Sequence, residues 1–253
     1  MRTTMNKRDQ QGLSIIELMV ALLLSSLLIL GVTQIYLDNK RSHIFQQGQA
    51  DNSDAARYSL AFLENELNKA GFRRRPDISY EEIFKADTNN GFPLRSIAAK
   101  IDNGIAIRYQ AAHPEQTSCD GADIASIPDR PYVGIDAPVL IANIVFANGK
   151  LQCQGETIVE GIADYKLLYA VGERTDATRS IERYTNNPQP NEEIRGIKYD
   201  ILFESPNPNA SDAADNGIYQ SWRKLHYNDN AAPPKKNIYQ IASNTIIFRN
   251  ATP

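Results

Sequence analysis

A long apolar stretch near the N-terminus is the clearest feature of the hydrophobic pattern. Residues 18–37 carry no formal charge and are rich in Leu, Ile, Val and Ala. As a helix they would extend about 30 Å, the thickness of the hydrocarbon core of a bilayer. Arg2, Lys7 and Arg8 precede the stretch and face a single acid, Asp9. This basic excess predicts one membrane crossing, with the N-terminus in the cytoplasm and the bulk of the chain exported.

A helical pattern continues over residues 38–70, which contain no proline. Apolar residues recur there at spacings of four and three, which places them on one face of a helix. The positions on this stripe are Ala56, Leu60, Leu63, Leu67 and Ala70. Gly71 follows as a natural C-cap, so the helix is expected to end near Ala70.

Residues 71–253 change from a helical period to alternation. Apolar residues alternate with Ala106 and Arg108 over 105–109, which predicts a half-buried strand. Asn148 and Gly149 separate two apolar segments within 139–153 and favour a two-residue type I′ hairpin turn. Further strands are predicted at 164–171, 197–203 and 244–249. We therefore expect an α+β fold, in which a mainly antiparallel sheet packs on the second half of the helix.

Two polar stretches, 172–191 and 205–230, are rich in Pro, Asn, Asp and Ser and are predicted to be surface loops. The second is longer than an ordinary connection, which indicates a mobile or functional segment. Trp222 lies in it, and a small satellite core is favoured over an exposed contact patch.

The amino-acid composition is typical of a folded domain and fits its export. The net charge of −3 and the hydrophobic content of 42% fit a globular domain without a nucleic-acid footprint. Cys119 and Cys153 are the only cysteines, and an exported domain meets oxidising conditions. We expect a disulfide between them, closing a loop of about 35 residues and contributing about 3 to 4 kcal/mol by chain entropy. The three scattered histidines give no zinc motif.

Candidate chemistry is sparse. The sequence contains no serine-hydrolase, zinc-peptidase, P-loop or dinucleotide-binding motif, so we predict no enzyme, no cofactor and no small-molecule substrate. Residues 87–91 resemble only part of a calcium loop, and Asp120 and Asp123 suggest calcium still more weakly. Turn formation explains both, and no metal site is predicted.

Arg73, Arg74 and Arg75 form the one concentrated basic site. As a hypothesis, they contact an acidic face of a neighbouring subunit, anionic lipid or DNA, although an ordinary solvated surface is favoured.

The junction before the apolar stretch, Gly12 to Glu17, has the sequence GLSIIE. A carboxylate at the edge of a membrane-length run is costly unless a cation pairs with it. An ordinary secretory signal peptide and a plain uncleaved anchor are alternatives. The long run, the lack of an A-x-A-like site and the interruption by Glu17 argue against the signal peptide.

The junction resembles the class III signal of type IV prepilins and type II secretion pseudopilins. The resemblance implies that a prepilin peptidase cleaves after Gly12 and that the new terminal residue, Leu13, is N-methylated. It also implies that Glu17 pairs with the terminal amine of a neighbouring subunit and sets the register of polymerisation. The family usually has Phe where Leu13 stands here. A glutamate that merely sits at the lipid headgroups is the alternative.

Three further segments resemble PilW-type minor pilins: 57–72 at the helix end, 159–169 at a strand entry, and 246–250 at the C-terminal Arg-Asn ending. That family often has a cysteine where Phe72 stands. The resemblance implies a low-abundance subunit that joins other minor pilins and the major pilin and primes pilus assembly. Adhesion and twitching motility would follow from the pilus, and any nucleic-acid contact is expected to be indirect. A GspJ-like minor pseudopilin and a tip adhesin or DNA-capture subunit using 205–230 are the alternatives.

The expected organisation follows from this resemblance. Residues 1–12 are the prepilin leader, 13–37 the transmembrane and filament-core helix, 38–70 its amphipathic continuation, and 71–253 the periplasmic β-rich domain. The precursor is expected in the inner membrane and the mature chain in the pilus, either at the tip or along the shaft.

Overall fold

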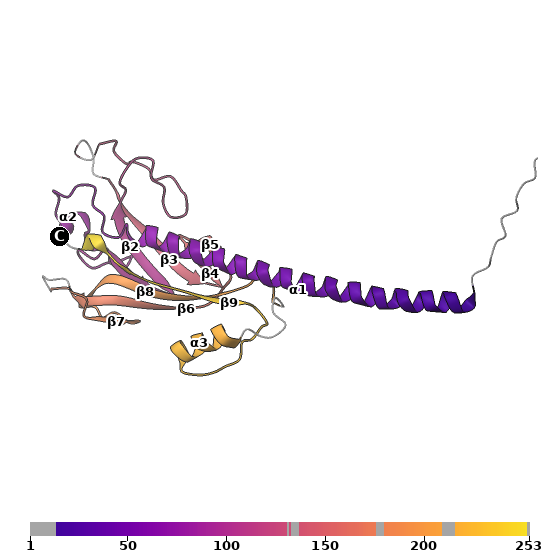
Figure 1. Ribbon diagram of the computed structural model, residues 1–253. Helices are drawn as coiled ribbons and strands as arrows, with labels where there is room; N and C mark the ends of the chain where they lie inside the picture. The colour runs from indigo at the N-terminus through magenta and orange to yellow at the C-terminus, as the bar shows by residue number, and fades with distance from the viewer. Residues whose placement is uncertain (1–13, 131, 133–136, 176–179, 209–215, 252–253) are drawn as a thin grey trace, which may run out of the picture. The chain divides into compact units, whose positions relative to one another are not determined.

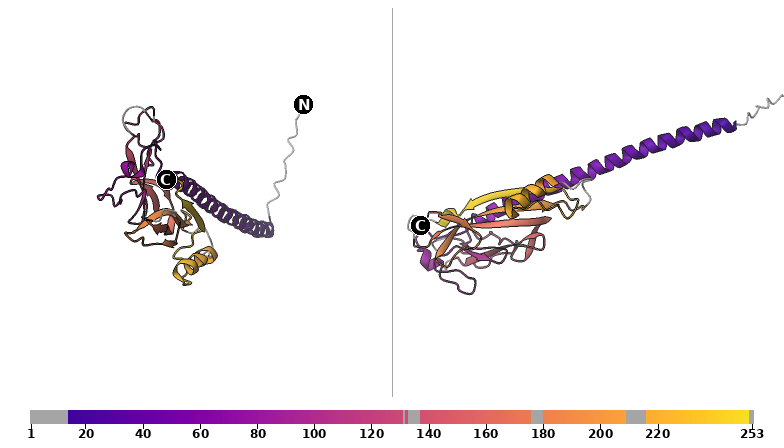
Figure 2. Two further views of the ribbon diagram at one scale, coloured as in Figure 1. Left: turned by 90° about the vertical axis from the view of Figure 1, so that its left-hand side faces the viewer. Right: turned by 90° about the horizontal axis from the view of Figure 1, so that it is seen from below.

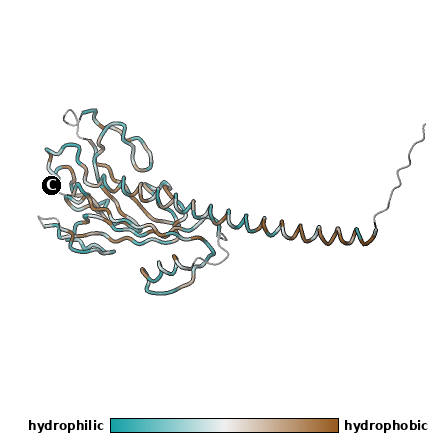
Figure 3. Tube along the Cα trace, in the orientation of Figure 1, coloured by the Kyte–Doolittle hydropathy of each residue, from teal (hydrophilic) through white to brown (hydrophobic). Residues whose placement is uncertain are grey.

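The computed structural model describes residues 14–130, 132, 137–175, 180–208 and 216–251 (Figure 1). The chain forms two compact units, residues 1–46 and residues 47–253. Helix α1 (Ile15–Leu67) contributes to both. Its N-terminal half is hydrophobic and its C-terminal half alternates in polarity (Figure 3). The sequence pattern predicted this change.

The second unit contains two antiparallel sheets rather than the single sheet expected. The first has the strand order β1-β2-β3-β4-β5 and the second the order β7-β6-β8-β9. The strands of the first sheet are β1 (Ala98–Ile101), β2 (Gly104–Gln110), β3 (Val139–Ala147), β4 (Lys150–Cys153) and β5 (Glu156–Glu160). Those of the second are β6 (Ile162–Glu173), β7 (Arg183–Thr185), β8 (Glu192–Glu204) and β9 (Tyr239–Ile247). Gly161, with φ of 81°, is the only residue between β5 and β6, so the chain passes directly from one sheet to the other.

The predicted hairpin is confirmed. Strands β3 and β4 pair antiparallel, with Ala147 opposite Lys150. Asn148 and Gly149 have φ of 52° and 72°. A type I′ turn requires positive φ at both central residues, and Asn-Gly meets that requirement at low cost.

The main core lies between α1 and the sheets, and its composition confirms the α+β expectation. The predicted helix stripe is buried at Ala56, Leu63, Leu67 and Ala70, whereas Leu60 is half-buried. From the sheets, Ile107, Tyr169, Ile197, Tyr199, Ile201 and Phe203 complete the same cluster. Helix stability in proteins comes mainly from packing of such an apolar face, so this core holds the second half of α1 in place.

The end of α1 is fixed by distant parts of the chain. The α-helix stops at Leu67, three residues before the expected end, because the last turn tightens into i→i−3 hydrogen bonds such as Ala70 N to Leu67 O (3.1 Å). Asn250 Nδ2 then donates to the carbonyl oxygens of Asn68 and Ala70, both at 3.2 Å. These bonds satisfy acceptors that a helix C-terminus leaves open.

Strand β2 is buried on both faces, so the prediction of a half-buried strand was wrong. Phe92 packs with Ala99 and Ala106 in a small cluster on the side away from the main core. The connection that carries Phe92 also contains the short helix α2 (Tyr80–Ile83), whose N-cap Ser79 Oγ accepts from Glu82 N (3.3 Å). The segment that precedes β1 therefore covers the face of β2 that the alternation had implied to be solvent-exposed.

The predicted surface loops contain regular structure. Strand β7 lies within 172–191, and helix α3 (Asn216–Tyr227) lies within 205–230. Figure 2 shows α3 beside β9. Trp222 is fully buried with Leu202 and Tyr239, which confirms the satellite core. A short 3₁₀ helix, η1 (Arg249–Ala251), follows β9.

His226 on α3 lies close to Asp200 of the sheet, and the interaction between them depends on the protonation of the histidine. Its ring lies 4.1 Å from the Trp222 ring, measured between centroids, and its Nε2 is 3.6 Å from Asp200 Oδ2. Burial lowers the pKa of His226 below its ordinary 6.5, and the Asp200 carboxylate opposes this shift without cancelling it. Lys166 and Lys198 also lower this pKa, and Asp164 raises it. The folded state therefore favours the neutral imidazole.

We expect acid to weaken the folded domain through this histidine. The pKa of His226 is lower in the folded state than in the unfolded state. Its contribution to folding stability is therefore fully present above pH 6.5 and is lost as pH falls through the folded-state pKa. The melting temperature of the full chain in detergent should fall between about pH 7.5 and about pH 5.5. His226→Gln should reduce this pH dependence, and identical profiles for the two proteins would contradict the assignment.

Candidate functional site

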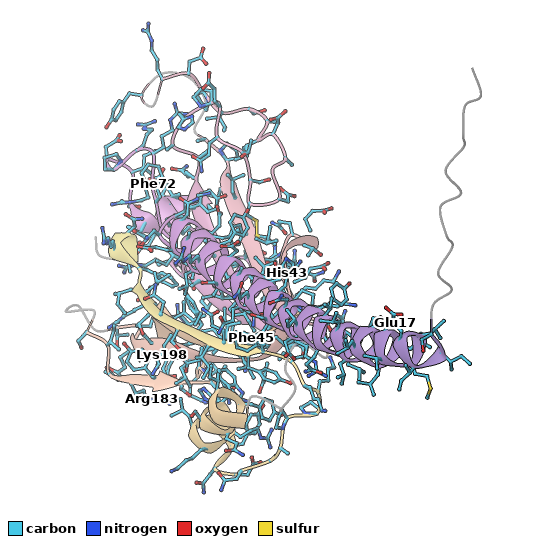
Figure 4. All side chains as sticks on the ribbon, turned by 45° about the vertical axis from the view of Figure 1, so that its right-hand side comes forward. Glu17, His43, Phe45, Phe72, Arg183 and Lys198 are labelled. Carbon is cyan, nitrogen blue, oxygen red and sulfur yellow. A yellow bond between two sulfur atoms is a disulfide. The ribbon has the colours of Figure 1, made fainter. Side chains whose placement is uncertain are left out.

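The N-terminal part of α1 is the first candidate site. Gly12 and Leu13 lie outside the described residues. Glu17 lies in the first turn of α1 (Figure 4). Every large apolar side chain from Ile15 to Tyr36 is at least 53% exposed. Among the described residues, α1 alone is long and apolar enough to cross a membrane, and its most apolar window is wholly unburied, unlike the core helix of a soluble domain.

The position of Glu17 suits pairing with a terminal amine. Glu17 is four residues after Leu13, a separation of about one turn in a helix. A carboxylate and an ammonium group that are both removed from water are tolerated when they pair. A chain that begins at residue 13 could supply this amine, either to its own glutamate or to that of a second copy.

Residues 7–33 match the family model described as the prokaryotic N-terminal methylation motif. The methylation motif spans Gly12, Leu13, Glu17 and most of the apolar stretch. Neither a search of curated proteins nor a search of solved structures found a match.

The methylation motif confirms the predicted prepilin-type signal and supports a type IV pilin-like or pseudopilin-like precursor. It implies processing by a prepilin peptidase and assembly with other pilins. Together with the apolar helix it fits membrane anchoring followed by pilus assembly, and it suggests a structural subunit rather than an enzyme.

The predicted disulfide is present. Cys119 and Cys153 are bonded, with their Cα atoms 6.0 Å apart, inside the usual range for a disulfide. Cys153 is the last residue of β4 and is fully buried. The bond therefore fastens the long connection between β2 and β3 to the first sheet.

The three arginines after α1 make mainly local contacts. Arg73 donates to a backbone carbonyl at 2.7 Å and lies 4.2 Å above the Tyr80 ring. Arg75 Nη2 pairs with Asp77 Oδ2 at 2.8 Å. Arg74 donates its backbone N–H to a side chain of β2 at 3.0 Å. A contact of this cluster with another molecule stays a prediction.

The two weak calcium suggestions correspond to turns. Asp87 accepts from Asn90 N at 3.2 Å and from Asn90 Nδ2 at 2.8 Å, and these bonds lower its pKa. Asp120 accepts from Ser118 Oγ and from the Ala122 amide, and its pKa is lowered for the same reason. Within the part of the chain that the structure describes, no three His, Cys, Asp or Glu side chains gather as metal ligands.

Sequence reasoning missed Glu66. This carboxylate is buried on α1 next to Leu67, in a cleft that the structure forms with the β2–β3 connection. Its spacing from Leu63 and Ala70, three before and four after, places it within the apolar stripe. The sequence signal that could have revealed Glu66 is a charged residue within the apolar stripe of a helix.

Proposed function

We propose that this chain is a PilW-type minor pilin. In this proposal the precursor inserts in the inner membrane, loses residues 1–12 by cleavage after Gly12, is methylated at Leu13, and joins other minor pilins and the major pilin through its N-terminal helix. The observation that carries the proposal is the methylation motif at 7–33, which overlaps the exposed apolar part of α1 over residues 15–33.

The proposed division of the chain into segments follows from this pilin assignment. Residues 13–37 act as membrane and filament-core helix, 38–70 continue that helix, and 71–253 form the periplasmic domain. The burial of Leu63 and Leu67 with the sheets supports a structural role for the second helical half in this domain.

Two segments that resemble PilW-type proteins also meet in space. Asn250, in the Arg-Asn ending, donates to carbonyl groups of Asn68 and Ala70 at the helix end. This contact gives a physical reason for the two segments to occur together, which supports the PilW-type assignment over a GspJ-like pseudopilin.

Deleting the gene for this chain should then reduce the number of surface pili and leave type II secretion unchanged.

Processing provides the first test. The full chain is expressed with and without a prepilin peptidase, and the intact mass and N-terminal fragments are measured. We expect a chain that begins at Leu13 and carries one methyl group, and only when the peptidase is present. An uncut chain, or a cut beyond Leu30, would contradict the pilin assignment.

A binding role at the pilus surface is the second candidate, because α3 exposes apolar side chains. Leu225 is 71% exposed and Ile218 is 37% exposed. Removing residues 205–230 would uncover Leu202 and Tyr239, which Trp222 covers, so a deletion would confuse folding with binding. Surface substitutions avoid this problem.

The double variant Ile218→Ser with Leu225→Ser separates the two roles. If the chain is an assembly subunit, the number of pili and their attachment should both stay within about twofold of the wild type, because exposed substitutions cost little stability. Normal pili with lost attachment would instead favour a binding role. Pilus counts and an adhesion assay on the same cells measure both.

A further inference from the structure

A cleft of about 730 Å³ lies between the end of α1, the end of β2 and residues 112–121. Its walls include Glu66, Lys69, Phe72, Tyr109, His113 and Glu115. Phe72, labelled in Figure 4, follows α1. Cys119 also lines the cleft, and its bond to Cys153 holds the covering segment to the first sheet. The volume is in the range of pockets that enclose a ligand or a large side chain.

Glu66 leaves one acceptor unused in this cleft. The residue is only 4% exposed. Its Oε1 accepts from Lys69 Nζ at 2.6 Å. Its Oε2 is buried and has no hydrogen-bond partner among the described residues. Because a buried carboxylate oxygen without a donor costs free energy, a donor that reached it after the side chains over it had shifted would stabilise it.

The charges around the cleft favour a cation. Glu66 and Glu115 contribute two carboxylates to the cleft, and Lys69 contributes one ammonium group. The surplus is therefore one negative charge. Asp120 adds to this negative charge. Burial raises the pKa of Tyr109, and the charges of Glu66 and Asp120 raise it further, to about 12.

An aromatic ring completes the arrangement. Lys69 Nζ lies 5.7 Å from the centroid of the Tyr109 ring, so the chain's own ammonium group already uses the carboxylate and the ring together. A flat guanidinium group can stack on an aromatic face and donate several hydrogen bonds in its plane. A guanidinium group therefore fits a hydrogen-bond acceptor beside an aromatic ring better than a second ammonium group would.

We propose that this cleft binds an arginine side chain of a neighbouring pilus subunit, whose guanidinium group donates to Glu66 Oε2 and stacks beside Tyr109. The identity of the partner rests on the proposed function, whereas the recognition of arginine rests on the cleft alone. Lys69 competes with the incoming guanidinium for Glu66 and limits the affinity.

The test uses the full chain in detergent micelles and N-acetyl-arginine amide, observed by saturation-transfer NMR. We expect saturable binding with a Kd of about 1 mM, which corresponds to a modest free energy of about −4 kcal/mol. The citrulline analogue has nearly the same shape without the charge, and it should bind at least about tenfold more weakly. Equal binding of the two probes would overturn the proposal.

Four substitutions separate recognition from folding. Glu66→Gln should weaken arginine binding about tenfold, and Lys69→Gln should strengthen it about threefold by removing the competitor. Glu64→Gln changes an exposed carboxylate of the same helix outside the cleft and should have no effect. If Glu66→Gln fails to fold, Glu115→Gln at the exposed rim should still weaken binding about threefold. Weaker binding by Lys69→Gln would overturn the proposal.

The outcome is independent of the pilin assignment. A processed and methylated chain that does not bind the arginine probe would refute the cleft proposal and leave the proposed function intact. A chain that binds the probe but is never processed would refute the proposed function, while the arginine site would stand.

Discussion

Replacing Glu17 with glutamine is expected to exclude the chain from pili while leaving it in the membrane. The substitution keeps the size of the side chain and removes the charge that would pair with a terminal ammonium group. Breaking a buried ion pair on one side costs about 3 kcal/mol or more. In an association equilibrium that cost lowers incorporation by a factor on the order of 100.

The measurement compares the chain in sheared pili with the chain in the membrane fraction by immunoblot. Asp38→Asn provides the matched control, because Asp38 is a carboxylate at the other end of the apolar stretch and accepts from Gln34 of its own helix at 3.0 Å. This control should be incorporated normally. Equal incorporation of Glu17→Gln would show that the glutamate only sits at the headgroups.

Replacing Arg108 is expected to cause the largest loss of stability in the globular unit. The residue is 3% exposed, and burial lowers its pKa to about 10, partly offset by Asp87, so it remains charged at pH 7. Its guanidinium group donates to the carbonyl oxygens of Phe84, Lys85, Pro93 and Ser96, and its Nη1 lies 2.6 Å from Lys85 O. It also lies 4.5 Å from the Phe92 ring. One side chain therefore organises the segment that covers β2.

Arg108→Leu should destabilise the fold by about 4 kcal/mol, because several buried carbonyl groups lose their donors at once. The melting temperature would fall by about 10 °C in a domain of this size. Arg108→Lys should recover only part of the loss, since an ammonium group cannot reproduce the planar fork. Arg95→Gln, which removes an exposed ion pair in the same segment, should cost less than about 0.5 kcal/mol. Equal effects of Arg108→Leu and Arg95→Gln would contradict this account.

The features that could be predicted from sequence depend on local chemistry. The long helix follows from periodicity and the absence of proline, and the hairpin follows from Asn148 and Gly149. The disulfide follows from the presence of only two cysteines in an exported domain. In each case the residues concerned decide the structure with little help from distant segments.

The features that were missed depend on what covers a segment. Arg108 was expected to face solvent, but Phe92 and its neighbours bury it from a connection without a regular pattern. Helix α3 was not predicted because its sequence is mainly polar. Of the described residues of this helix, only Tyr219 and Trp222 belong to the satellite core. Glu66 likewise becomes a candidate site only when the β2–β3 connection forms a wall over it.

The junction between Asn250 and the end of α1 also constrains the order in which the protein can fold. Asn250 contacts Asn68 and Ala70, which are synthesised some 180 residues earlier. Contacts of such long sequence separation form late and slowly. The helix would enter the bilayer long before the ribosome reaches its final capping residue, so the last packing step must follow translocation of the whole domain. A chain that stopped before Asn250 would leave the carbonyl groups of Asn68 and Ala70 without this donor.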